Sequence, residues 1–115
     1  MVGSTVALPP QAIATNYFVK STSASVDFLL NGAEWSWQIS TDDTVEELVD
    51  EYTVNISETK TAVENDLTLT AYRFSDGVVA VWSDGSCAMT LYGEREAALT
   101  DVLAVAGQLV EANNE

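Results

Sequence analysis

Residues 26–39 read VDFLLNGAEWSWQI, and this stretch predicts a β-hairpin. Apolar residues alternate with other residues on both sides of the central Asn31-Gly32 pair. Asn-Gly favours a two-residue type I′ turn, because that turn needs positive φ at both central residues. The turn pairs the apolar residues of the two runs: Leu30 with Ala33, Phe28 with Trp35, and Val26 with Trp37. These six side chains then share one face of a sheet, which we expect to be buried.

Further strands are predicted on both sides of the hairpin. Residues 67–74 alternate, residues 78–82 are apolar, and residues 86–92 return after the second of two Asp-Gly turns, which predicts a three-stranded meander. Residues 12–20 fit either a strand or a helix face. Their Tyr-Phe-Val run favours the strand.

Two helices are predicted. The apolar residues of 42–52 recur with helical spacing, and acidic residues occupy the first turn, where the helix dipole favours them. Residues 94–112 have a wide apolar stripe: Ala98, Leu99, Val102, Leu103, Val105, Ala106, Leu109 and Val110. A break is expected between residues 52 and 58, and residues 58–65 read as a second short helical turn or a loop.

These elements predict an α+β domain spanning residues 1–115, with residues 1–10 as an extended N-terminal segment. An antiparallel sheet of about five to six strands would carry two main helices on one face, in the order strands, helix, strands, helix. The C-terminal helix would be the main cover of the face that carries Phe28, Trp35 and Trp37.

Composition excludes several kinds of chemistry. The 115 residues include 18 acidic and 4 basic side chains, no histidine and one cysteine, for a formal charge of −14. Histidine-based catalysis and histidine metal ligands are therefore absent, and a disulfide within the chain is impossible. Because no nucleophile elbow, P-loop or dinucleotide-binding motif occurs either, we expect no enzyme activity, no cofactor and no metal site.

The charge also restricts the partners. Direct binding to DNA, RNA or an anionic membrane needs clustered basic residues, and the four present are scattered: Lys20, Lys60, Arg73 and Arg95. The sequence has neither a secretory signal at its start nor an apolar run long enough to span a bilayer. We therefore expect a cytoplasmic protein, in a host cytosol or in a virion if the source is viral.

One face of the first predicted helix concentrates negative charge. Six acids occur within ten residues, with no basic residue among them: Asp42, Asp43, Glu46, Glu47, Asp50 and Glu51. Like charges four residues apart destabilise an isolated helix by roughly 0.2–0.5 kcal/mol per pair, so stability alone does not explain the pattern. The face is either a solvated surface of a salt-adapted or generally acidic protein or a docking surface for a basic partner. A calcium site is disfavoured, because the chain has no Asp-x-Asp-x-Asp-Gly loop.

The aromatic residues suggest one further candidate. Trp35 and Trp37 are expected in the core, although a stacking platform is an alternative. Trp82 lies beside an Asp-Gly turn and is a candidate anchor at an interface, with core packing as the alternative. Cys87 is expected to be a buried, inert thiol.

These features predict a non-enzymatic acidic protein-binding module. It would be an inhibitor of the immunity or anti-defence type, and nucleic-acid mimicry is one form that this could take. Its binding residues would be the six acids of 42–51 together with Trp82. The partner would be a basic protein such as a nuclease, a toxin or a nucleic-acid-binding complex. The alternative is a structural subunit of a virion or another assembly from a high-salt organism.

Overall fold

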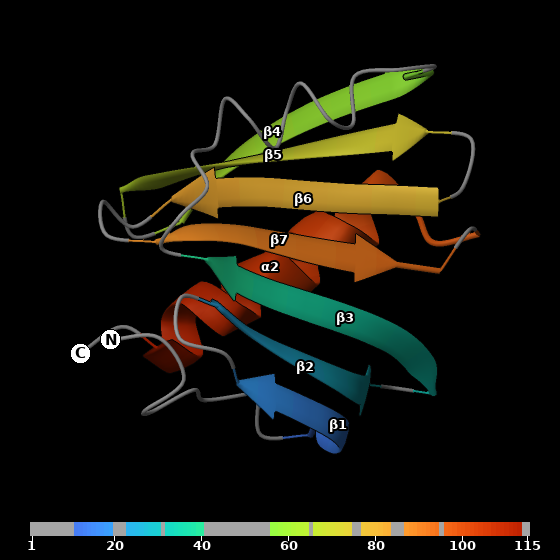
Figure 1. Cartoon of the computed structure of the whole chain (residues 1–115). Coiled ribbons are helices and arrows are strands. Elements are labelled where there is room, and N and C mark those ends of the chain that lie inside the picture. The colour runs from blue at the N-terminus through green and yellow to red at the C-terminus, as the bar shows by residue number, and fades with distance from the viewer. Residues whose placement is uncertain are drawn as a thin grey trace.

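The computed structural model describes residues 11–19, 23–30, 32–40, 56–64, 66–74, 77–83, 87–94 and 96–113. Seven strands form one antiparallel sheet in the order β1-β2-β3-β7-β6-β5-β4, and helix α2 (Leu99–Asn113) lies behind this sheet in Figure 1. The strands are β1 (Ile13–Val19), β2 (Ser23–Leu30), β3 (Ala33–Ser40), β4 (Glu58–Glu64), β5 (Leu67–Phe74), β6 (Gly77–Ser83) and β7 (Ala88–Gly93).

The predicted hairpin is confirmed with its register. Strands β2 and β3 pair Leu30 with Ala33, Phe28 with Trp35, and Val26 with Trp37. Gly32 has φ of 81°, a left-handed conformation that glycine adopts without steric cost. Five of the six inward side chains are buried, and Ala33 is partly buried. Local turn chemistry and alternation therefore set this part of the sheet.

The strand interpretation of residues 12–20 is also confirmed. Strand β1 pairs antiparallel with β2, and its register shifts at a β-bulge between Ala14 and Asn16. The later strands β5, β6 and β7 form the predicted meander. Pairing of β3 with β7 joins this meander to the hairpin, and it places Trp37 opposite Leu91 within one apolar face.

The predicted architecture of five to six strands with two helices on one face is wrong. The sheet has seven strands, and α2 is the one helix in the described ranges. The additional strand is β4, from the segment interpreted as a helical turn or loop. It is an edge strand whose side chains are mostly exposed, so burial imposes no apolar alternation on its sequence ETKTAVE. The predicted helix over 42–52 lies outside the described residues.

Helix α2 has the predicted apolar stripe but begins later than expected. Seven of the eight predicted stripe residues are buried, and Ala98 is exposed just before the helix begins. The segment before the helix forms a turn closed by the Ala97 amide, which donates to the Glu94 carbonyl at 3.0 Å. The backbone of α2 lies over β4, β5, β6 and β7, rather than mainly over the hairpin. The side chains of Phe28, Trp35 and Trp37 nevertheless belong to the same core as the helix stripe.

Strand β6 is buried on both of its faces. On the side of α2, Val78, Ala80 and Trp82 belong to the main core. On the opposite side, Val79 and Val81 form a smaller core with Ala88, against which three aromatic side chains pack: Tyr72, Phe74 and Tyr92. A strand that is buried on both faces has a continuous apolar sequence, as GVVAVWS does.

No described helix is long and apolar enough to cross a membrane.

Candidate functional site

The structure describes one of the seven predicted binding residues, Trp82. The six acids of 42–51 lie outside the described residues. Trp82 lies in the main core, with 2% of its surface exposed. Strand β6 is paired on both sides, and Trp82 sits opposite Met89 of β7 on the face toward α2. Trp82 therefore packs inside the protein, and its indole is not available as an interface anchor.

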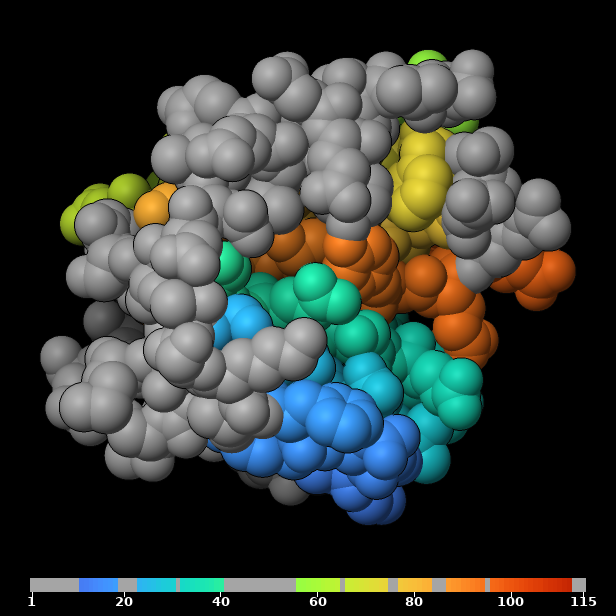
Figure 2. Space-filling model, viewed as in Figure 1, coloured from blue at the N-terminus to red at the C-terminus, as the bar shows by residue number. Residues whose placement is uncertain are grey.

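A row of side chains crosses the face of the sheet opposite α2. The strand registers place four of them in line over β1, β2, β3 and β7: Asn16, Asp27, Ser36 and Tyr92. Figure 2 views the molecule from this side, with β1 to β3 in blue to green. The row lines a groove of about 390 Å³, here called the strand groove. Its remaining walls come from Thr15, Phe28, Glu34, Trp35, Gly93 and Glu94.

A second groove lies between the end of the hairpin and α2. This helix groove has a volume of about 430 Å³. Its walls are Leu30, Ala33 and Trp35 from the hairpin, and Glu94, Glu96, Ala97, Asp101, Ala104, Val105 and Gln108 from the C-terminal segment. Trp35 and Glu94 line both grooves, so the two grooves adjoin at this end of the sheet.

The first residues of β3 are linked to the segment that follows β7. The Glu34 amide donates a hydrogen bond to Glu94 Oε2 at 3.2 Å. Trp35 follows directly in β3 and is 6% exposed, and the backbone of Gly93 lies against its ring. This contact holds the carboxylate of Glu94 at the junction of the two grooves.

Negative charge is concentrated along both grooves. Five acids line them: Asp27, Glu34, Glu94, Glu96 and Asp101. The described part of the chain contains two of the four basic residues, Lys60 and Arg73, and neither lines either groove. Carboxylates along a concave surface attract cations, because the surrounding low-dielectric walls focus the field. The grooves are therefore suited to positively charged groups, such as lysine or arginine side chains.

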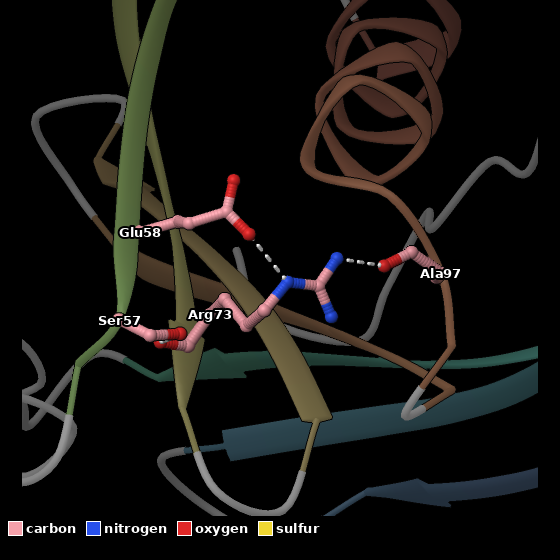
Figure 3. A network of polar contacts seen from close by, with 4 residues as sticks. All are labelled: Ser57, Glu58, Arg73 and Ala97. Atoms are coloured by element: carbon pink, nitrogen blue, oxygen red, sulfur yellow. Dashed lines mark hydrogen bonds and ion pairs between the residues drawn. The ribbon is translucent and has the colours of Figure 1, made fainter.

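Arg73 is engaged within the fold, as Figure 3 shows. Its Nε donates to Glu58 Oε1 at 3.0 Å, and its Nη2 donates to the carbonyl of Ala97 at 2.6 Å. The side chain of Arg73 is 26% exposed and that of Glu58 is 61% exposed, so solvent weakens the ion pair. The bond to Ala97 holds the turn before α2 against β5, and it thereby fixes one wall of the helix groove.

A third groove, of about 460 Å³, lies along α2 beside β4. Its acids are Glu64 and Glu111, and the rest of its wall is largely apolar: Leu103, Ala104, Gly107, Gln108 and Ala112. The side-chain hydrogen bond with Glu111 raises the pKa of Glu64 above its ordinary value, and desolvation and the charge of Glu111 add to this effect. Glu64 therefore binds a proton more readily than an isolated carboxylate does, so it loses its negative charge at a higher pH than an isolated carboxylate would.

Sequence patterns alone did not identify the two acidic grooves. Glu34 alternates with the inward residues of the predicted hairpin, and Glu94 and Glu96 fall in the first turn of the helix predicted over 94–112. Only the pairing of β3 with β7 brings these segments together. Within the described ranges, no group of three or more Cys, Asp or Glu side chains is arranged to hold a metal ion.

Comparison with known proteins identified no relative of this chain. No protein-family model matches the chain, and neither a curated protein nor a solved structure shows significant similarity to it.

Proposed function

We propose that this chain is a non-enzymatic, acidic protein-binding module whose partner presents a basic surface. The partner class is a nuclease, a toxin or a nucleic-acid-binding protein, and the module acts as an inhibitor that competes with nucleic acid for that surface. Its place of action is the cytoplasm, or a virion if the source is viral.

The observation that carries this proposal is the acidic junction of the strand groove and the helix groove. Five carboxylates surround two adjoining concavities, and no basic side chain of the described residues lines them. The sequence adds six further acids in residues 42–51, within a formal charge of −14. Two separate groups of acidic residues thus favour a cationic partner.

Binding of this kind has a defined physical signature. Opposite charges accelerate the encounter of two proteins, and this acceleration falls as salt screens the charges. Lysine and arginine side chains of the partner would enter the grooves, where carboxylates line the walls. Nucleic-acid-binding surfaces carry such side chains at high density.

Neutralising either acidic group should weaken binding to a basic probe. We expect at least about a tenfold loss of affinity for an oligo-arginine peptide, equivalent to about 1.4 kcal/mol. Titration calorimetry at low and physiological salt measures the affinity of each variant for this peptide. The 42–51 variant combines Glu46→Gln, Glu47→Gln and Asp50→Asn. The groove variant combines Glu34→Gln, Glu96→Gln and Asp101→Asn, and it leaves Glu94 to accept its hydrogen bond.

A matched control removes three carboxylates from elsewhere on the surface. It combines Glu64→Gln, Asp66→Asn and Glu111→Gln, and Asn suits position 66 because the backbone there has φ of 67°. We expect this variant to weaken binding by about threefold or less, through net charge alone. Equal losses in all three variants would mean that the charge is spread over the surface and that no site recognises the probe.

A structural subunit from a high-salt organism is the second candidate, and the uncharged edge strand β1, which suits assembly, favours it. Thermal melts in dilute buffer and in multimolar salt separate the two functions. The binding module should be folded in dilute buffer, because its charge serves recognition. If the chain unfolds without multimolar salt, the acidity is an adaptation to solvent and the inhibitor proposal loses its motivation.

A further inference from the structure

The two edges of the sheet differ in charge. Strand β4 forms one edge and has three charged residues, Glu58, Lys60 and Glu64. Strand β1 forms the other edge, and its sequence IATNYFV contains no charged residue. Proteins protect exposed edge strands against pairing with other chains by placing charges on them. The sheet therefore has one charged edge and one uncharged edge, and the uncharged edge carries the β-bulge between Ala14 and Asn16.

The uncharged edge also exposes large apolar side chains. Ile13 is 64% exposed, Tyr17 47% and Phe18 59%. Tyr17 is in register with Val26 and so lies on the α2 side of the sheet, whereas Phe18 is in register with Ser25 and lies on the opposite side. Apolar side chains are thus exposed along both faces of the edge, as in a strand that continues into another sheet.

We propose that β1 pairs antiparallel with β1 of a second copy of this chain, which joins two seven-stranded sheets across a two-fold axis. In such an isologous contact each copy offers the same surface, so an uncharged strand meets an uncharged strand. A two-fold axis normal to the sheet keeps the faces continuous and places the two Phe18 side chains on one common face. No described strand lies beyond β1 (Figure 1).

Electrostatics favour a second copy over a basic partner at this edge. A basic partner gains nothing from a strand without carboxylates, and the acidic grooves attract it instead. Two copies with a charge of −14 each repel one another, and contact is least unfavourable where neither has charge. Dimer formation should therefore strengthen as salt rises. Binding of a basic protein should weaken, so the two proposals respond to salt in opposite directions.

The test is the solution mass at a series of protein concentrations and salt concentrations, measured by sedimentation velocity. We expect a dimer of twice 12.4 kDa whose affinity increases from about 0.05 to 1 M salt. Phe18→Lys should weaken the dimer by about tenfold or more, because it places two positive charges at the contact. The matched control is Val63→Lys on β4, where the side chain is 70% exposed, and it should leave the dimer unchanged.

A monomer under all conditions would overturn the proposal, and so would a dimer that Val63→Lys disrupts as strongly as Phe18→Lys. Circular dichroism verifies that both variants are folded. If Phe18→Lys does not fold, hydrogen exchange of the unmodified protein decides. Protection of the β1 amides must rise with protein concentration, and protection that is independent of concentration rejects the contact.

Discussion

Gly93→Ala is expected to lower the free energy of unfolding by about 2–3 kcal/mol, within the range for an overpacked core. A Cβ atom at this position would lie 2.6 Å from Cζ3 of Trp35 and 2.8 Å from Cγ2 of Val78. Both neighbours are buried, at 6% and 0% exposure, so neither can move aside into solvent. Urea denaturation followed by circular dichroism measures the loss as a lower midpoint with an unchanged slope.

Gly107→Ala is the matched control for this substitution. Gly107 lies within α2, and a Cβ there would approach Glu64 Oε1 at 3.3 Å, at the end of a side chain that can shift. Alanine is favoured over glycine in a helix interior by up to about 1 kcal/mol, so this variant should be as stable as the parent or more so. A Gly93→Ala variant with the stability of the parent would show that the ring of Trp35 is not fixed against β7.

The hairpin could be predicted in full because all of its determinants are local. The turn type follows from two adjacent residues, and the alternation on each side fixes which side chains face inward. The stripe of α2 is equally local, since one buried helix face imposes a period of 3.6 residues. The position at which α2 begins could not be predicted from local sequence. It depends on Arg73 of the distant strand β5, which donates a hydrogen bond to the Ala97 carbonyl and holds the turn before the helix.

Strand β4 escaped prediction because its environment leaves no pattern in the sequence. As an edge strand it is exposed at most positions, and exposed positions accept threonine and charged residues as readily as apolar ones. The signal that was available is the turn that follows, where Asp66 has φ of 67° between the paired residues Glu64 and Leu67. Asn and Asp tolerate this conformation better than other non-glycine residues, so Asn65-Asp66 marks a hairpin.

The candidate site depended on pairing that no local pattern specifies. Glu34 and Glu94 are sixty residues apart in the chain and meet through a hydrogen bond between the start of β3 and the end of β7. An acidic residue that faces outward from a strand looks the same in sequence whether it borders a groove or open solvent. The acidity of the chain could be predicted from its composition. To predict that the acidic side chains gather at the junction of two grooves, one must know the order of the strands in the sheet.

Trp82→Ala should have the largest effect of any single substitution considered, a loss of about 3–5 kcal/mol in the free energy of unfolding. The indole is 2% exposed and is among the largest fully buried side chains of the protein. Its removal deletes contacts with the main core and leaves a cavity between β6 and α2, which a paired central strand cannot collapse to fill. The loss is a large part of the 5–15 kcal/mol that typically stabilises a domain. Thermal and urea unfolding followed by far-ultraviolet circular dichroism measure it without relying on tryptophan emission.

Phe18→Ala provides the comparison that separates a core residue from a surface anchor. Phe18 is an aromatic residue of the same sheet with 59% of its surface exposed, so its truncation should change the stability of the monomer by no more than about 0.5 kcal/mol. An interface anchor at position 82 would give the reverse pattern, with an intact fold and weaker binding to a partner. Unchanged stability of Trp82→Ala would therefore refute the packing of Trp82 beneath α2. A cooperative loss of several kcal/mol would confirm that Trp82 is a core residue and would remove it from the candidate binding residues.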